Sequence, residues 1–518
     1  PVGALTAKPY ALSYRPWEEL YTESIDLSDS LAVPIRVYSD LDKIIRILPQ
    51  YNVHLETCWI HDKARYFFDA LNVQRITSPL IRKTKLINFN LNSIKSSQKY
   101  PDFIKLSWKQ LSKALFALSS LFNKNYKLKT FVGNYLDLLT LLKVKKVNLT
   151  LGFNNIYNCI EHTPMGATEL INEDFDINYL LKNYKFSDYK SFFLVNLNLR
   201  FENPVLNSKL RNVVLWKEGV KVYFFGPRYS FTNKYTHLGT TTRALLKFIE
   251  GRYYLANCFP LKHEKNPQLS LILYGSGIRQ MYKNTVYKSM FNYLKKVHRY
   301  VHVNYLARNV SSIGAYDLAL SNYITKEFNS YKEKLNTIYH YIGCNDFEIN
   351  KKEIKQKTLS IYQNSHFPSK MMDEIDCFLP SKSPHEIEKS YFINCFGILQ
   401  IHRRSILAYN NQVKDDIEIL KILFNILNTK KKKLIEVPKK DIKTSISSYL
   451  PIHLYDIRRV RFFEINLIHV KIHNEFIYYT IMTDEMKDFY TSDLITALSR
   501  NMNSLSYAFF RKKSVFSL

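Results

Sequence analysis

Runs of consecutive apolar residues alternate with helical patterns across the middle of the chain. The runs 192–195 and 220–225 are each followed by an amphipathic segment, at 206–214 and at 241–249. A further apolar run covers residues 269–274. Strands that are apolar on both faces and separated by helices are typical of parallel βαβ units. The pattern therefore predicts a doubly wound α/β core.

The residues before this core follow other patterns. Prolines interrupt residues 1–80, and the short apolar runs 35–38 and 44–48 lie between them. These runs predict strands in a small, mostly β module. Ser107 and Gln110 have the spacing of a helix capping box, and leucines then recur at helical intervals. We therefore expect an amphipathic helix over residues 107–122.

The composition narrows the fold and function classes. With 518 residues, 46% of them hydrophobic, the chain can bury a large core divided over two to four domains. No apolar run approaches the ~18 residues that a spanning helix needs, so we expect no insertion into a membrane. Thirteen glycines argue against several glycine-rich phosphate loops. Six cysteines are too few for a disulfide scaffold, which favours a reducing compartment.

The charge has two interpretations. Lys and Arg outnumber Asp and Glu by 74 to 45, and the net charge of +29 would suit a nucleic-acid partner. However, Lys, Asn, Ile, Tyr and Phe all have A/T-rich codons, so an A/T-rich genome would supply the same lysines. The lysines are scattered, and the densest group is Lys430–Lys433 with Lys439 and Lys440. We expect a solvated linker near residues 428–442.

Motifs for metal or cofactor binding are missing from the sequence. The cysteines at 58, 159, 258, 344, 377 and 395 include no CxxC, the spacing that clusters and structural zinc sites commonly use. His298 and His302 are four residues apart, which would put both on one face of a helix, but Arg299 stands where a metallopeptidase has Glu. Gly275, Ser276 and Gly277 lack the third glycine of a dinucleotide turn. These patterns thus predict a large α/β protein without a recognisable group of catalytic residues.

Six stretches of the sequence match one family in order. The beginning, Pro1-Val2-Gly3-Ala4-Leu5 with Arg15-Pro16-Trp17, resembles the 75-kDa iron–sulfur subunit of respiratory complex I. The further matches cover residues 59–65, 74–82, 198–204, 235–239 and 488–493. In that family a cysteine directly before the Pro-Val-Gly-Ala-Leu run is the last ligand of a [4Fe–4S] cluster. This sequence starts one residue later, so the resemblance implies that it would be either one half of a split subunit or the remainder of a longer chain.

The resemblance implies where cofactors lie. The [2Fe–2S] and [4Fe–4S] clusters of the family are bound upstream, and Pro1, Val2, Gly3, Ala4 and Leu5 are expected beside one of them. Some bacterial members hold an additional cluster near Cys58 with four cysteines; here Cys58 stands alone, so we expect that cluster to be absent. We also expect no molybdopterin. The scarcity of glycine agrees with its loss, and residues 394–397 depart from the family pattern.

The resemblance also implies a domain organisation. The expected fold is α/β, with doubly wound, mostly parallel sheets of the molybdopterin-oxidoreductase type after a small β-rich module. Residues 1–22 would be the tail of the upstream iron–sulfur module, and 23–80 a β-rich domain without a cluster. Residues 81–380 would form the core, and 381–518 its C-terminal part.

The role implied by the resemblance is structural. The chain would support electron transfer from NADH to ubiquinone in the mitochondrial inner membrane complex, on the matrix side, with no catalytic residue of its own. Its partners would be other peripheral-arm subunits, including the N-terminal iron–sulfur part and the flavin-bearing NADH-binding subunits, and no nucleic acid. Two alternatives remain: an active molybdopterin oxidoreductase, and a basic mitochondrial nucleic-acid-binding scaffold.

Overall fold

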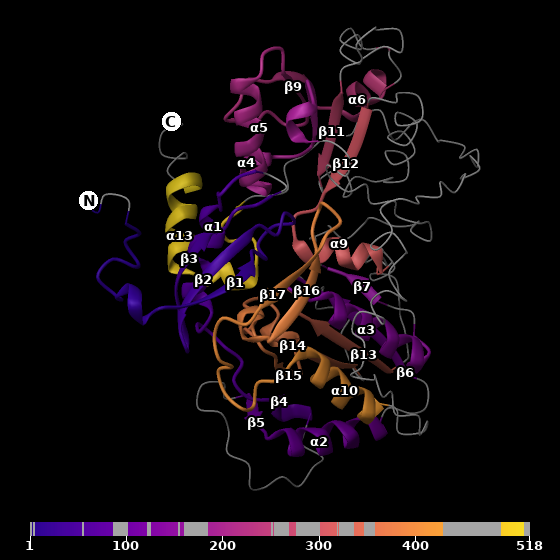
Figure 1. Ribbon diagram of the computed structural model, residues 1–518. Coiled ribbons are helices and arrows are strands. Elements are labelled where there is room, and N and C mark those ends of the chain that lie inside the picture. The colour runs from indigo at the N-terminus through magenta and orange to yellow at the C-terminus, as the bar shows by residue number, and fades with distance from the viewer. Residues whose placement is uncertain are drawn as a thin grey trace.

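The architecture was obtained as a computed structural model. It describes residues 3, 6–53, 56–85, 102–121, 126–153, 156–159, 185–249, 252, 269–275, 301–318, 320, 336–345, 358–427 and 488–511. The expected lysine-rich linker near 428–442 lies outside the described residues, as do Pro1, Val2, Ala4, Leu5, Ser276, Gly277 and His298. The strands form a five-stranded, a seven-stranded and a three-stranded sheet and a two-stranded hairpin. In Figure 1 the sheet with β9, β11 and β12 lies at the top, the sheet with β6, β13 and β14 at the bottom, and β1–β3 to one side.

The beginning of the chain forms the small β module. Its antiparallel sheet has the order β1–β2–β3, and β2 and β3 contain the two predicted strands, which are thereby confirmed. Along β2 the buried residues alternate with less buried ones, because only one face of this sheet meets the core. The elements are η1 (Pro16–Glu18), β1 (Leu20–Ile25), β2 (Pro34–Asp40), β3 (Lys43–Pro49), α1 (Asp62–Tyr66) and η2 (Phe67–Ala70).

The seven-stranded sheet has the order β5-β4-β15-β14-β13-β6-β7 and is parallel except at β4 and β5. Helix α2 begins with the predicted capping box, since Ser107 N–H donates to Gln110 Oε1 (2.9 Å). The elements are β4 (Leu80–Arg82), η3 (Lys83–Lys85), β5 (Phe103–Lys105), α2 (Trp108–Leu121), β6 (Tyr126–Val132), α3 (Leu138–Leu151), β7 (Ile156–Asn158), β13 (Asn336–Ile342), β14 (Thr358–Asn364), η7 (Met372–Glu374), β15 (Cys377–Pro380) and α10 (Asp416–Leu427).

The five-stranded sheet is parallel throughout, in the order β10-β9-β8-β11-β12. Every residue of the central strand β8 is buried, as its unbroken apolar sequence predicts. The doubly wound, mostly parallel architecture is thus confirmed. The elements are η4 (Phe186–Asp188), β8 (Ser191–Val195), α4 (Leu199–Glu202), α5 (Pro204–Trp216), β9 (Lys221–Phe225), β10 (Thr236–Gly239), α6 (Thr242–Ile249), β11 (Ser270–Gly275), β12 (Val301–Leu306) and α9 (Val310–Asp317).

The last segments return to the small module. A hairpin of β16 and β17 lies against β1, and the C-terminal helices pack on η2, so Figure 1 shows the yellow end of the chain beside its indigo beginning. Among the described residues, no helix is long and apolar enough to cross a membrane. The elements are η8 (Pro384–Glu386), β16 (Lys389–Ile393), β17 (Leu399–Arg403), α12 (Leu494–Ala497), α13 (Arg500–Ser506) and η10 (Tyr507–Arg511).

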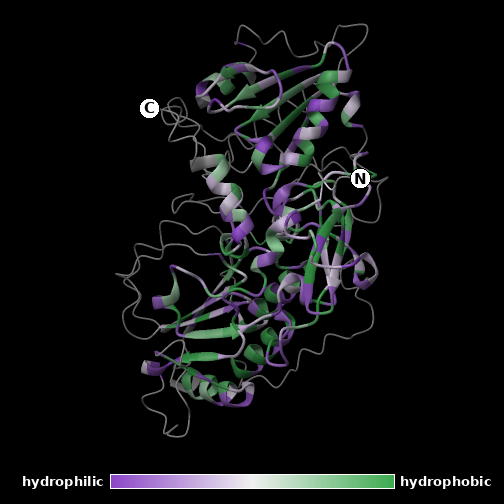
Figure 2. Cartoon of the chain, turned by 90° about the vertical axis from the view of Figure 1, so that its left-hand side faces the viewer, coloured by the Kyte–Doolittle hydropathy of each residue, from purple (hydrophilic) through white to green (hydrophobic). Residues whose placement is uncertain are grey.

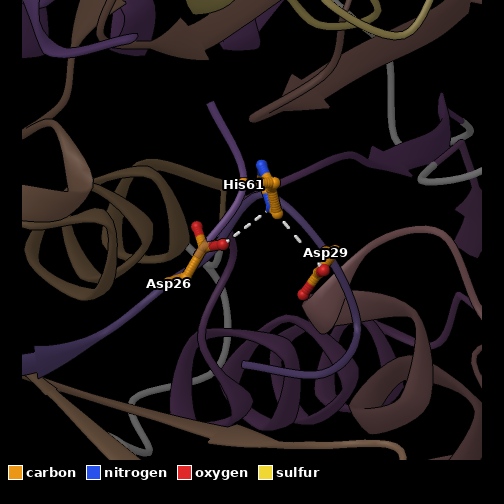
Figure 3. Close-up of side chains that lie close together, drawn as sticks. All are labelled: Asp26, Asp29 and His61. Atoms are coloured by element: carbon orange, nitrogen blue, oxygen red, sulfur yellow. Dashed lines mark ion pairs between the residues drawn. The ribbon is translucent and has the colours of Figure 1, made fainter. Parts of the chain in front are cut away.

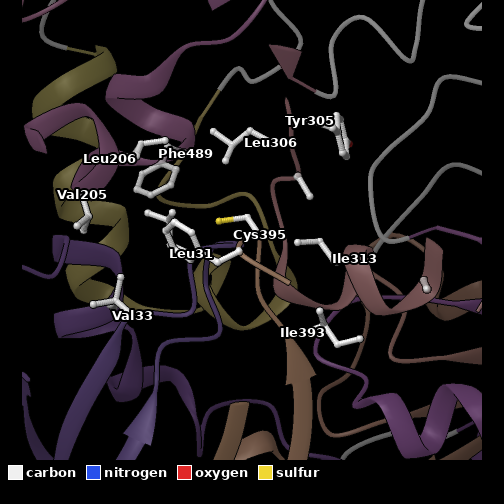
Figure 4. Close-up of a cluster of buried hydrophobic side chains, with 14 of the residues drawn as sticks. Leu31, Val33, Val205, Leu206, Tyr305, Leu306, Ile313, Ile393, Cys395 and Phe489 are labelled. Atoms are coloured by element: carbon white, nitrogen blue, oxygen red, sulfur yellow. The ribbon is translucent and has the colours of Figure 1, made fainter. Parts of the chain in front are cut away.

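One hydrophobic cluster joins these parts. Figure 2 shows the strands of both large sheets as mostly hydrophobic, and Figure 4 shows side chains from distant segments meeting where the sheets adjoin. All members of this cluster are buried side chains. Those labelled are Leu31, Val33, Val205, Leu206, Tyr305, Leu306, Ile313, Ile393, Cys395 and Phe489. Because the module and both large sheets contribute, these parts form one packed body.

Candidate functional site

Gly3 is the one described residue of the five that were expected beside an iron–sulfur cluster. It has a φ of +71°, a conformation that favours glycine, and its carbonyl accepts a hydrogen bond from Thr6 N–H (3.1 Å). Gly3 is exposed. The proximity of Pro1–Leu5 to a cluster stays a prediction.

The described cysteines are free thiols in unlike surroundings. Cys58 is exposed and Cys159 half-buried, whereas Cys344, Cys377 and Cys395 are buried. Burial raises the pKa of these three thiols, which keeps them protonated. Cys344 uses its hydrogen to donate to Phe131 O at 3.4 Å. Metal and cluster ligands are thiolates, so the buried cysteines have the character of packing residues.

The small module does not fit a four-cysteine cluster. Cys58 is its single cysteine within residues 20–69, and its side chain faces solvent. A [4Fe–4S] cluster takes four converging thiolates. The residues present therefore cannot hold the additional cluster that the resemblance associates with some bacterial members.

The same module instead contains a buried group of two carboxylates and an imidazole, which Figure 3 shows pointing toward one another. Asp26 and Asp29 lie in the turn between β1 and β2, and His61 caps the N-terminus of α1. His61 Nε2 is 2.9 Å from Asp26 Oδ2 and 3.6 Å from Asp29 Oδ2. All three side chains are at most 3% exposed. This group is the candidate functional site.

Hydrogen bonds fix how the imidazole is protonated. Ala64 N–H donates to His61 Nδ1 (3.1 Å), so the hydrogen of the neutral ring is on Nε2. Ser28 Oγ donates to Asp26 Oδ1 (2.7 Å) and therefore accepts from Nε2 (3.0 Å). As a result, Asp26 Oδ2 and Asp29 Oδ2 accept no hydrogen bond from any residue that the structure describes.

Burial and mutual charge shift the pKa values of this group. Burial raises the pKa of Asp29 to about 7, aided by the nearby Asp26 charge and opposed by His61. Burial also acts to raise the pKa of Asp26, but His61 and the Ser28 hydrogen bonds outweigh it and lower that pKa. The pKa of His61 is raised, because the two carboxylates outweigh burial. Burial therefore opposes ionisation of all three groups, and the mutual attraction of His61 and the carboxylates offsets it for Asp26 and His61.

The sequence contained only a weak signal for this site. Asp26 and Asp29 interrupt a stretch of apolar and small residues before β2. Such a stretch is typical of a buried segment, where charged residues are unusual. His61 follows much later in the chain, without a spacing that any metal motif uses. The helical position expected for His302 is wrong, because His302 lies in strand β12. Its Nδ1 lies 2.7 Å from Tyr189 OH, so it has a structural partner.

In open α/β sheets, cofactors bind at the carboxyl ends of the parallel strands. They bind at the point where the strand order reverses, so that the connections from two neighbouring strands run in opposite directions. In the five-stranded sheet this point lies between β8 and β11. A Cβ on Gly275 would come within 2.8 Å of Leu197 Cδ1, so an apolar side chain occupies the approach. The buried side-chain amides of Asn196 and Asn203 make no hydrogen bond to described residues, and a polar ligand would satisfy them. The Leu197 contact weighs against a phosphate there.

In the seven-stranded sheet the corresponding point lies between β6 and β13. Gly133 and Gly343 directly follow these strands, and a Cβ on Gly133 would lie 2.2 Å from Gly343 O. The two backbones therefore fill the crevice themselves. A dinucleotide-type cofactor needs this space for its phosphates, so the residues at this edge do not fit one.

Comparisons with known proteins give two family matches, and the second is to a cluster-binding domain although residues 20–69 contain a single cysteine. The family described as "Molybdopterin oxidoreductase" matches residues 75–426. A second family, "NADH-ubiquinone oxidoreductase NDSU1/NuoG-like, 4Fe-4S domain", matches residues 20–69, which contain the Asp26–Asp29–His61 group.

Several curated relatives are named as the 75 or 78 kDa subunit of NADH-ubiquinone oxidoreductase. The NADH-ubiquinone oxidoreductase 75 kDa subunit of Reclinomonas americana is 30% identical over 481 residues, covering 89% of this chain and 64% of the relative. That of Dictyostelium citrinum is 29% identical, covering 86% and 61%. The mitochondrial 78 kDa subunit of Candida albicans is 29% identical, covering 83% and 56%.

The resemblance to 75-kDa-type subunits is thus confirmed. The chain spans somewhat less than two thirds of the length of these relatives. The match over residues 75–426 and the doubly wound sheets together lead to one conclusion: the chain belongs to the molybdopterin oxidoreductase family.

Proposed function

We propose that this chain is a structural part of the large peripheral-arm subunit of mitochondrial complex I. One observation carries the proposal: 481 residues align with the NADH-ubiquinone oxidoreductase 75 kDa subunit of Reclinomonas americana. In this proposal the enzyme is NADH:ubiquinone oxidoreductase. The [2Fe–2S] and [4Fe–4S] clusters on the electron path are held by the part of the subunit that this chain does not span.

The chain itself would carry no redox centre. Its described buried thiols have raised pKa values, and its small module has a single, exposed cysteine. The closed strand edges at Gly133 and Gly275 support the absence of molybdopterin. The active molybdopterin oxidoreductase is therefore the less favoured alternative, although the family is the same.

The contribution of the chain would be rigidity beside the electron path. Two buried ion pairs connect distant segments: Lys63 with Asp493, and Arg75 with Glu386, each at 2.7 Å. Breaking a buried pair leaves an uncompensated charge, so such pairs hold segments in one arrangement. Pro1–Leu5 would pack beside a cluster held by the upstream part, in keeping with the tight turn at Gly3.

The partners would be the N-terminal iron–sulfur part and the flavin-bearing NADH-binding subunits, on the matrix side of the inner membrane. Large exposed aromatic side chains are suited to such contacts, since a rigid ring buries much area at little entropy cost. Trp17, Trp59 and Trp216 are 78%, 62% and 87% exposed. The nucleic-acid-binding scaffold remains an alternative that rests on the net charge of +29 alone.

Native electrophoresis of solubilised mitochondrial membranes tests the proposal. The band that oxidises NADH in the gel is excised and its proteins are identified by mass spectrometry. We expect peptides of this chain in that band, in the same molar amount as the flavin-bearing subunit. Recovery of the chain in ribosomal particles, with none in the NADH-oxidising band, would overturn the proposal.

A further inference from the structure

We propose that Asp26, Asp29 and His61 form a binding site for one divalent transition-metal ion, such as Zn²⁺. Each residue offers one potential ligand atom, and these three atoms lie within 4.8 Å of one another. We assign them as Asp26 Oδ2, Asp29 Oδ2 and His61 Nε2, the atoms of the two ion pairs. Each comes from a fixed part of the module, two from the turn before β2 and one from the start of α1. The site goes beyond the proposed function, which requires no metal in this chain.

The spacing of the three atoms suits a metal. Ligands at ~2.0–2.1 Å from a tetrahedral ion lie about 3.3 Å from one another. The two distances from His61 Nε2, 2.9 Å to Asp26 Oδ2 and 3.6 Å to Asp29 Oδ2, bracket that value. Figure 3 shows the carboxylates converging on the ring from two sides. The two carboxylate oxygens lie at most 4.8 Å from each other, so side-chain rotation would bring them to the spacing around an ion.

Two buried carboxylate oxygens share a single imidazole as their ion-pair partner among the described residues. Asp26 Oδ2 and Asp29 Oδ2 accept no hydrogen bond from the described residues, and their side chains are 1% and 0% exposed. Leaving such oxygens unsatisfied is costly in a protein interior. The neighbouring cation, Lys63, has its own partner in Asp493. A divalent ion would neutralise both carboxylates and give the site a net charge of zero.

The ligand set selects the class of ion. Calcium and magnesium prefer oxygen ligands only, whereas an imidazole with carboxylates suits zinc and other first-row transition metals. Three protein ligands leave one position open. Ser28 Oγ, 3.0 Å from His61 Nε2, is placed to complete four ligands.

Binding would change the hydrogen bonds of His61 in a defined way. Coordination by Nε2 moves the ring hydrogen to Nδ1, so Ala64 N–H loses the acceptor that it now has at 3.1 Å. The first turn of α1 should therefore exchange its amide hydrogens faster once the metal is bound. A metal held elsewhere in the chain would not have this effect.

Two substitutions test the site with little disturbance. Asp29→Asn keeps the shape of the side chain and removes one charged ligand. His61→Asn removes the imidazole, while Asn remains a good N-cap for Ala64 N–H. Asp42→Asn is the matched control, because Asp42 is exposed in the same module. Circular dichroism checks that each full-length variant is folded.

The measurement is Zn²⁺ binding by the full 518-residue chain, by competition with a chromogenic chelator. We expect one tightly bound Zn²⁺ in the wild type and in Asp42→Asn, and affinity at least ~100-fold lower in either ligand variant. With Co²⁺ as the probe, the wild type should show d–d absorption without a thiolate charge-transfer band, which reports the ligands even if a variant fails to fold. Unchanged affinity in both variants, a thiolate band, or no bound metal in the wild type would overturn the proposal.

Discussion

Nζ of Lys63 lies 2.7 Å from Oδ2 of Asp493 and 2.8 Å from the hydroxyl of Ser492, in a site where the lysine side chain is only 2% exposed. The first residue belongs to α1 of the small module, and the second caps α12 near the end of the chain. Lys63 lowers the pKa of Asp493, against the effect of burial. The pair thus joins the C-terminal segment to the small module.

Replacing Lys63 by Met should weaken the fold strongly, because it leaves the Asp493 carboxylate buried and unpaired. We expect a loss of about 3–5 kcal/mol in the free energy of unfolding, measured by urea titration. Lys185→Met is the control, since Lys185 is 73% exposed in its pair with Glu56 and its loss should leave the free energy of unfolding almost unchanged. Equal losses in the two variants would show that the buried pair is not a structural link.

Asp416 should make stability depend on pH. Burial raises its pKa to about 7 from an ordinary value of 3.8, while a hydrogen bond from Gln363 Nε2 (2.7 Å) acts in the opposite direction. A carboxyl group whose pKa is raised in the folded state contributes stability to the fold. This contribution is fully present when the pH is below the pKa of the same group in the unfolded chain. This contribution is lost as the pH rises through 7.

The Asn variant of Asp416 isolates this effect. Between pH 5 and pH 8 the free energy of unfolding of the wild type should fall by roughly 2–3 kcal/mol, since a pKa change of one corresponds to about 1.4 kcal/mol. Asp416→Asn should not show this fall. Thermal unfolding at a series of pH values provides the comparison, with exposed Asp373→Asn as the control. Parallel curves for the wild type and Asp416→Asn would contradict the assignment.

Local patterns predicted local structure well. The capping box of Ser107 and Gln110 involves neighbours in sequence, and the buried strands β8 and β11 are apolar on both faces, so each could be recognised alone. Sheet order could not be predicted in this way. Strand β6 pairs with β13, far along the chain, and nothing in either sequence specifies that partner. The division at residues 22, 80 and 380 stays a proposal.

The candidate site was missed for the same reason. His61 reaches Asp26 and Asp29 only because α1 packs against β3 and places its N-cap at the turn before β2. Known metal motifs depend on short fixed spacings, which this group lacks. Its single sequence signal was a pair of acidic residues in a stretch of otherwise apolar or small residues.

The closed crevice between β6 and β13 can be tested by adding one methyl group. In Gly133→Ala the new Cβ would lie 2.2 Å from Gly343 O and 2.4 Å from Cys344 Cα, both backbone atoms that cannot easily move. We expect a loss of about 3 kcal/mol or more in the free energy of unfolding. Gly152→Ala, where no atom lies within 4 Å but φ is +81°, should cost only about 1–2 kcal/mol. A stable Gly133→Ala protein would mean that the edge is open enough for a ligand.

The chain should not assemble an iron–sulfur cluster. After anaerobic incubation with iron and sulfide, the purified 518-residue chain should retain neither in stoichiometric amount, because four converging thiolates are lacking in its small module. Cys58→Ser should behave as the wild type does. Stoichiometric iron and sulfide that disappear in Cys58→Ser would contradict this expectation.

The central claim is that the chain is held in complex I by contacts with other subunits rather than by its charge. Exposed charge pairs are screened beyond about 4 Å at a salt concentration of ~0.5 M, while apolar contacts persist. The decisive measurement is the molar ratio of this chain to the flavin-bearing subunit in purified complex I, before and after a ~0.5 M salt wash with nuclease. We predict an unchanged ratio of one to one and unchanged NADH oxidation. Release of the chain by nuclease or salt, while the flavin-bearing subunit stays in the complex, would contradict the account.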